Sequence, residues 1–262
     1  MSDMLGQASA SSQPFPRRWL FRIWGSPDIH SRQKWTILWP HLAQLSQQDV
    51  RLLDAGCGRG QWALELAARR PDWSVVGVDR CAESLEVAQA GRRRLGLSNV
   101  EFVQADFLSF QPAEPFDAVL SVASAHYLVQ QGKGPALFHS IRTWLTPGGR
   151  LYLLGPRWTP EAPFVSWLPA PSTHDLFSFQ DLTLLCQSNG LSVTTLRGCV
   201  GPPGALAKQL HCCAVGLFRI PLLALLYPLE LALTTLDARA KYDQDRPTVM
   251  LLLIAQTVAG AS

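Results

Sequence analysis

Charged residues are scarce in this sequence, and they form no long basic stripe. Among its 262 residues, 16% are Asp, Glu, Lys or Arg, whereas soluble domains usually have about a quarter. Lys and Arg together number 23 against 20 Asp and Glu, which gives a formal net charge of +3. Because nucleic-acid binders concentrate basic residues on one face, this balance argues against a nucleic-acid partner. The 47% apolar residues exclude disorder of the whole chain.

Cysteine pairs of the kind found in metal sites and disulfide frameworks are missing as well. The six cysteines are scattered, and no two form a CxxC pair: Cys57, Cys81, Cys186, Cys199, Cys212 and Cys213. This spacing predicts no metal site and no disulfide scaffold, and it favours a reducing, cytoplasmic compartment.

A run of apolar residues long enough to cross a bilayer is also missing. The most apolar segment, 206–236, has an uncharged run of only ten residues between Arg219 and Glu230, interrupted by Pro221 and Pro228. A spanning helix needs about 20 apolar residues, so we expect no transmembrane helix here. Three interpretations stay open: a lid over a hydrophobic acceptor, a contact with a membrane surface, and added core or a homodimer contact.

The beginning of the sequence divides into two parts. Residues 1–14 are rich in Ser, Gln and Ala and lack the pattern of a secretory signal, which predicts a flexible tail. Residues 15–49 begin with aromatic and basic residues and continue with Trp35, Leu38 and Leu42 at helical spacing. They predict an N-terminal helical segment, either a lid over the ligand site or a helix that simply packs its apolar face on the domain that follows.

Strand and helix patterns alternate from residue 50 onward. The predicted strands are 50–55, 73–78, 100–105, 116–122 and 150–154, and the predicted helices are 61–70, 82–95 and 135–145. Such alternation predicts an α/β fold with a doubly wound, Rossmann-like parallel sheet, because parallel neighbours need crossover helices. Ligands of such sheets bind beyond the carboxyl ends of the strands.

The second half of the chain is less regular. A capping-type start at Ser178 and a glycine stop at Gly190 predict one more helix. Two further strands are predicted at 191–196 and 248–258. The segment between them is longer than an ordinary connection, which predicts an apolar helical insertion over 200–246. The core domain would then comprise residues 50–199 and 247–262.

A glycine-rich turn joins the first strand of the core to its first helix. Glycines 56, 58 and 60 allow a tight turn and close approach of the backbone to a ligand. Asp79 ends the next strand, where a carboxylate can accept hydrogen bonds from both hydroxyls of a ribose. Gln61 stands where a dinucleotide fingerprint needs glycine, and the Lys-Ser/Thr pair of a P-loop is missing. The turn therefore predicts a nucleotide site of another type.

Five segments, in order, resemble the motifs of class I S-adenosylmethionine-dependent methyltransferases. Asp54-Ala-Gly-Cys-Gly-Arg-Gly60 resembles the first motif, Val75-Val-Gly-Val-Asp79 the second, and residues 100–107 the third. Residues 116–122 and 145–154 resemble the fourth and fifth strands of that family. The resemblance implies a seven-stranded sheet with an antiparallel last strand, and S-adenosylmethionine as the cofactor.

The resemblance also implies roles for individual residues. Asp54, Gly56 and Gly58 would cradle the methionine part of the cofactor, Asp79 would bind the ribose, and Asp106 would accept the adenine amino group. Ser121 would lie near the sulfonium. The full implied cofactor site is Asp54, Ala55, Gly56, Cys57, Gly58, Gly60, Asp79, Arg80, Cys81, Asp106, Phe107 and Ser121.

Two residues that follow the fourth strand are candidates for the part of the site that binds the methyl acceptor. Transfer to oxygen needs a group that removes the hydroxyl proton, and His126 is the candidate base. The alternative is a histidine that only fills the loop after the strand. Tyr127 is predicted to form a wall of the pocket. The Asn/Asp-Pro-Pro-Tyr motif of base-modifying methyltransferases is missing, since Ser121 to Ser124 occupy its place.

These observations predict a methyltransferase for a small or lipid-like hydrophobic acceptor, with oxygen favoured over nitrogen or carbon as the methylated atom. Two alternatives stay open. One is a methyltransferase for a polar sugar or polyketide acceptor. The other is a methyltransferase-like scaffold that binds a cofactor or partner without turnover.

Overall fold

The computed structural model describes residues 29–45, 49–156, 178–201 and 250–258, together with residues 229, 232, 233, 236 and 237. Its strands are β1 (Arg51–Ala55), β2 (Ser74–Asp79), β3 (Val100–Gln104), β4 (Phe116–Val122), β5 (Leu145–Pro156), β6 (Leu191–Val200) and β7 (Met250–Thr257). Its helices are α3 (Ile29–Leu42), α4 (Gln61–Arg69), α5 (Ala82–Leu95), α6 (His126–Gln130), α7 (Gly134–Trp144) and α8 (Phe179–Ser188).

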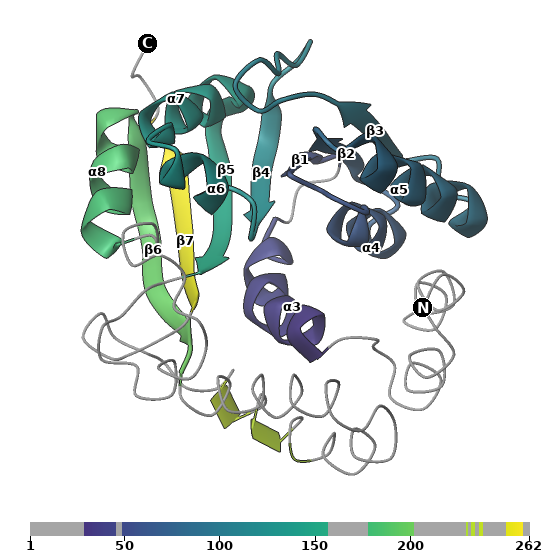
Figure 1. Cartoon of the computed structure of the whole chain (residues 1–262), viewed down its shortest axis with the longest axis horizontal. Coiled ribbons are helices and arrows are strands. Elements are labelled where there is room, and N and C mark those ends of the chain that lie inside the picture. Colours follow the sequence, from purple (N-terminus) through teal and green to yellow (C-terminus); the bar gives the residue numbers. More distant parts are fainter. Residues whose placement is uncertain are drawn as a thin grey trace. The chain divides into compact units, whose positions relative to one another are not determined.

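The seven strands form one sheet in the order β3-β2-β1-β4-β5-β7-β6 (Figure 1). Strands β1 to β5 pair in parallel, and the direction in which strands are added reverses between β1 and β4. This is the switch point at which doubly wound sheets bind ligands. The predicted Rossmann-like α/β fold is confirmed.

Strand β7 runs antiparallel to both of its neighbours, as the resemblance implies. Against β5, the side chain of Thr257 donates to the carbonyl of Thr146, and that of Gln256 donates to the carbonyl of Gly148. Residue numbers therefore increase in opposite directions along the two strands. Against β6, the Thr194 hydroxyl donates to the Ile254 carbonyl at 3.1 Å, and the N–H of residue 258 donates to the carbonyl of residue 190 at 3.2 Å.

Apolar runs explain which strands are central. Leu52 and Leu53 of β1 are both fully buried, and so are three consecutive leucines of β7, at 251–253. Strands of a sheet that is covered on both faces need such continuous apolar runs, because neighbouring side chains point to opposite faces.

Several elements differ from the sequence predictions. Strand β6 continues to Val200, four residues beyond its predicted end. The short helix α6 was not predicted. Helix α3 ends at Leu42, before the end of the predicted helical segment at residue 49. Strand β5 begins at residue 145, five residues before the predicted start. Phe116 of β4 pairs with Leu145 and Ala118 with Arg150, so the Pro-Gly-Gly segment forms an irregularity within the strand pairing.

The predicted start of helix α8 is confirmed at atomic detail. The hydroxyl of Ser178 accepts the backbone N–H of Asp181 at 2.9 Å. This bond satisfies one of the N–H groups that the first helical turn leaves without a partner. The helix ends before Gly190, which has a φ of 68°.

The chain divides into two compact units. The first comprises residues 1–44, 157–172 and 197–251, and the second comprises residues 45–156, 173–196 and 252–262. In the first unit, Asp237 is buried and accepts hydrogen bonds from the Gln33 amide at 3.1 Å and the Gly201 backbone at 2.9 Å. Leu38 and Leu42 of α3 are fully buried, in agreement with the predicted apolar face.

The predicted tail and most of the predicted insertion lie outside the described residues, and so does part of the predicted lid. Within 200–246, residues 229, 232, 233, 236 and 237 are helical. In the part of the chain that the structure describes, no helix combines the length and apolar character needed to cross a membrane.

Candidate functional site

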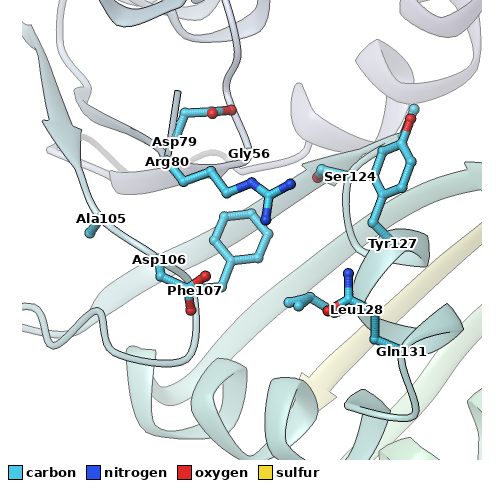
Figure 2. A pocket seen from close by; sticks show the side chains of 11 residues that line it. Gly56, Asp79, Arg80, Ala105, Asp106, Phe107, Ser124, Tyr127, Leu128 and Gln131 are labelled. Atoms are coloured by element: carbon cyan, nitrogen blue, oxygen red, sulfur yellow. The ribbon is translucent and has the colours of Figure 1, made fainter. Parts of the chain in front are cut away.

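A pocket of about 280 Å³ lies at the carboxyl ends of strands β1 to β4, next to the switch point (Figure 2). Its wall is built from the turn after β1, the ends of β2 and β3, and the segment that leads from β4 into α6. The lining residues are Gly56, Asp79, Arg80, Ala105, Asp106, Phe107, Ala123, Ser124, Tyr127, Leu128 and Gln131.

The glycine turn forms the floor of this pocket at Gly56. Its φ of 79° belongs to the left-handed region, which disfavours residues with a Cβ. A Cβ at this position would overlap the Cβ of Ser124 and lie 2.9 Å from Cζ of Phe107. The backbone N–H of Gly56 donates to the carbonyl of Val78 at 2.8 Å, which ties the turn to the end of β2.

Asp79 is held in place by backbone donors on both of its carboxylate oxygens. Oδ2 accepts the N–H of Gly58 at 2.8 Å, and Oδ1 accepts the N–H of Cys81 at 2.9 Å. Each carboxylate oxygen can accept more than one hydrogen bond. The carboxylate therefore keeps acceptor capacity on two adjacent oxygens at the pocket wall, an arrangement suited to the paired hydroxyls of a ribose.

Asp54 lies below the turn and does not line the pocket. It is 1% exposed, and its Oδ2 accepts the N–H of Ala63 at 3.2 Å, in the first turn of α4. The carboxylate thus caps α4 from the neighbouring strand. Burial is the main cause that raises the pKa of Asp54 to about 7, with the charge of Asp79 adding to it and the Ala63 hydrogen bond opposing it.

The end of β3 supplies an aromatic wall. The Phe107 ring lines the pocket and packs edge to face against Trp144, with 6.4 Å between ring centroids. Asp106 beside it is exposed, and its Oδ1 accepts the N–H of Leu108 at 2.9 Å. Figure 2 shows the Arg80 side chain directed across the pocket toward the Phe107 ring. A planar heterocycle with an amino group fits such a combination of ring, cation and carboxylate.

The segment after β4 closes the pocket opposite Asp79. Ala123 has a φ of 54°, in the left-handed region that non-glycine residues rarely adopt. Its N–H donates to the carbonyl of Leu154 at 2.8 Å. The hydroxyl of Ser124 donates to the carbonyl of Ala55 at 2.8 Å, and the Ser121 hydroxyl lies 2.8 Å from that of Ser124.

His126 and Tyr127 begin α6 with very different exposure. Tyr127 is 60% exposed and lines the pocket, where the sequence predicts it. His126 is 8% exposed and does not line the pocket. Their rings lie 4.0 Å apart at an interplanar angle of 36°. The role of His126 as a base stays a prediction.

The structure brings part of the predicted site together around the pocket. The predicted residues that line it are Gly56, Asp79, Arg80, Asp106, Phe107 and Tyr127. The predicted residues that lie outside the lining are Asp54, Ala55, Cys57, Gly58, Gly60, Cys81, Ser121 and His126. Of these, Cys57 is buried, and this burial strongly raises the pKa of its thiol.

Sequence reasoning missed five lining residues, namely Ala105, Ala123, Ser124, Leu128 and Gln131. The run of small residues after β4 is the signal that could have identified two of them, because a close approach of backbone to ligand requires small side chains. Leu128 and Gln131 depend on the unpredicted helix α6. Among the described residues, His, Cys, Asp and Glu form no cluster that could hold a metal ion.

Residues 52–149 match the protein-family model described as "Methyltransferase domain". The release factor glutamine methyltransferase of Escherichia coli (strain K12) is 36% identical over 80 residues, which are 30% of this chain and 29% of that protein. The trans-aconitate 2-methyltransferase of Azoarcus sp. (strain BH72) is 36% identical over 117 residues, 44% of this chain and 43% of that protein. The chain thus spans less than half the length of these curated relatives.

Among solved structures, the geranyl diphosphate C-methyltransferase from Streptomyces coelicolor A3(2) is similar with a TM-score of 0.59 and 20% identity. The similarity covers 87% of this chain and 76% of that one. That structure holds geranyl-S-thiolodiphosphate and S-adenosyl-L-homocysteine. At this identity, the likeness supports the fold.

Proposed function

Residues 52–149 form a methyltransferase domain of the class I, S-adenosylmethionine-dependent type, and from this premise we propose that the whole protein methylates a small or lipid-like hydrophobic acceptor. Oxygen is the proposed site of methylation. When bound, S-adenosylmethionine supplies a methyl group on a positively charged sulfur, which a nucleophile can displace. The contribution expected of the protein is to hold cofactor and acceptor in line.

The observation that carries the proposal is the arrangement of Asp79 beside the glycine turn, where its carboxylate accepts the N–H of Gly58. Asp79 would bind the ribose hydroxyls, because both of its oxygens are already oriented by backbone donors. Phe107 and Arg80 would lie against the adenine ring, and Asp106 would accept its amino group. This division of roles uses the pocket-lining residues that the sequence predicted.

The proposal of a hydrophobic acceptor rests on the apolar insertion. Leu229 and Leu236 are helical residues of this segment, and their exposed fractions are 49% and 62%. Their exposed side chains offer apolar surface, which suits a hydrophobic acceptor. Contacts with a membrane surface or with a second copy of the chain are the alternatives, which vesicle sedimentation and analytical ultracentrifugation would detect.

The proposal of oxygen rests on His126, which begins α6 beside the pocket-lining Tyr127 and is itself buried outside the lining. A neutral imidazole can take the proton of a hydroxyl acceptor. The names of the relatives do not select the atom, since one of the solved structures is a C-methyltransferase.

Calorimetry followed by turnover tests the proposal in two steps. Titration with S-adenosylmethionine and S-adenosylhomocysteine should show binding to one site per chain. Methyl-labelled S-adenosylmethionine is then incubated with a hydrophobic metabolite extract and, separately, with polar sugar and polyketide fractions. Label in the hydrophobic fraction is the expected result. Label in a polar fraction would select the alternative acceptor, and binding without any labelled product would select a non-catalytic scaffold.

A further inference from the structure

Two serine hydroxyls connect the end of β4 to the end of β1. The hydroxyl of Ser124 donates to the carbonyl of Ala55 at 2.8 Å, and the hydroxyls of Ser121 and Ser124 lie 2.8 Å apart. A serine hydroxyl has a single hydrogen, and that of Ser124 is used for Ala55. The Ser121 hydroxyl is therefore the donor to Ser124, and the two form a chain in which each bond strengthens the next.

These hydrogen bonds hold the peptide unit between Ala55 and Gly56. The carbonyl of that peptide accepts from Ser124, and its N–H donates to the carbonyl of Val78 on β2 at 2.8 Å. The peptide plane is thus held from two opposite strands. Gly56 has no side chain that could restrict its rotation, so these two hydrogen bonds are the polar contacts that set its orientation.

Packing at the same point leaves little room for movement. A Cβ on Gly56 would overlap the Cβ of Ser124 and lie 2.6 Å from its Oγ. Ser124 follows Ala123, whose left-handed backbone is itself tied to Leu154 on β5. Both Ser124 and Gly56 line the pocket. The position of the pocket floor relative to the segment after β4 therefore depends on Ser124.

We propose that Ser124, oriented by Ser121, is a positioning residue that fixes the Ala55–Gly56 peptide for binding of the methyl donor. The proposal rests on the proposed function, because the ligand is S-adenosylmethionine. Loss of the Ser124 hydroxyl leaves the Ala55 carbonyl without its donor and allows the peptide to rotate. The pocket floor then no longer has one fixed shape, and the ligand must order it on binding.

The test compares S-adenosylhomocysteine affinity across four variants of the full chain. Ser124→Ala should raise the Kd about tenfold, the value of one hydrogen bond of about 1.4 kcal/mol. Ser121→Ala should raise it less, and Ser124→Thr, which keeps a hydroxyl, should restore most of the affinity. Ser188→Ala removes a hydroxyl that donates to the Leu185 carbonyl at the end of α8, outside the pocket lining, and should leave the Kd unchanged.

Amide hydrogen exchange provides a readout that does not need the ligand. Ser124→Ala should accelerate exchange in the 53–60 segment, where the Gly56 N–H is bonded to Val78, and leave β7 unaffected. An unchanged Kd and unchanged exchange in Ser124→Ala would overturn the proposal. So would a Kd that rises equally in Ser188→Ala, or one that Ser124→Thr does not recover. If Ser124→Ala fails to fold, Ser121→Ala decides by the same two readouts.

Failure of the proposed function would look different. Wild-type protein would then not bind S-adenosylhomocysteine at all, whereas the exchange result at 53–60 would still report whether Ser124 holds the peptide.

Discussion

The Cβ of Ser124 occupies the space in which a side chain on Gly56 would have to lie, and its Oγ is 2.6 Å from an ideal Cβ at that position. Gly56→Ala must therefore displace the segment after β4 as well as adopt a φ of 79°. We expect a loss of about 2–5 kcal/mol in the free energy of unfolding, from the left-handed backbone and the overpacking together. Urea unfolding measures the loss.

Gly58→Ala is the matched control for this prediction. Its φ of 52° is also left-handed, but a Cβ there would meet no atom within 4 Å. The expected loss is then only the backbone cost of about 1–2 kcal/mol. Equal losses in the free energy of unfolding at the two glycines would show that the contact with Ser124 adds nothing to the cost of a Cβ on Gly56.

Asp79→Ala should weaken cofactor binding strongly while the chain stays folded. Both oxygens of this carboxylate are fixed by backbone N–H groups, so it can receive two ribose hydroxyls without reorganisation. Loss of charge-assisted hydrogen bonds should cost about 2–3 kcal/mol or more, on the order of a hundredfold in Kd. Calorimetry with S-adenosylhomocysteine measures this. Asp72→Ala, which removes a surface partner of Arg70, is the control and should leave the Kd unchanged.

Asp54 should make the stability of the protein fall as the pH rises from about 4 to about 7. Its folded pKa of about 7 lies above the ordinary value of 3.8, so the native state binds more protons than the unfolded state in this window. Asp54→Asn keeps an oxygen acceptor for the Ala63 N–H but cannot ionise. The stability difference between variant and wild type, measured in urea, should therefore shift in favour of the variant as the pH rises. A difference independent of pH would contradict the raised pKa.

His126→Gln should lower turnover about 100- to 10,000-fold and leave the affinity for S-adenosylhomocysteine nearly unchanged, if the imidazole removes the acceptor proton. Because His126 is buried, the melting temperature of the variant must be measured alongside. A lower melting temperature with unchanged kcat would identify a purely structural histidine.

Leu229→Ser combined with Leu236→Ser should reduce acceptor turnover without affecting cofactor binding. Both side chains are about half exposed or more, so their replacement should cost little in stability. Leu184→Ser changes a similarly exposed leucine on α8, at 56% exposure, and serves as the control. Unfolding of the double variant would show that the segment is ordinary core.

Much of the fold follows from local patterns that the sequence displays. The strands β1 and β4, the helix end at residue 95 and the cap at Ser178 are properties of short segments, and the structure confirms them. The glycine turn and Asp79 were predictable for the same reason. A turn of this type requires left-handed glycines, and an acid at the end of the following strand completes the site within one βαβ unit.

Tertiary structure decided which side chains meet across the pocket. Ser124 reaches the Ala55 carbonyl only because β4 pairs with β1, and the sequence separates the two residues by 69 positions. Local patterns therefore predicted the glycine turn, whereas the serine bridge, α6 and the burial of Asp54 depend on how distant segments pack. A contact between strands that are remote in sequence is set by the register of the sheet, and no periodicity within either strand records it.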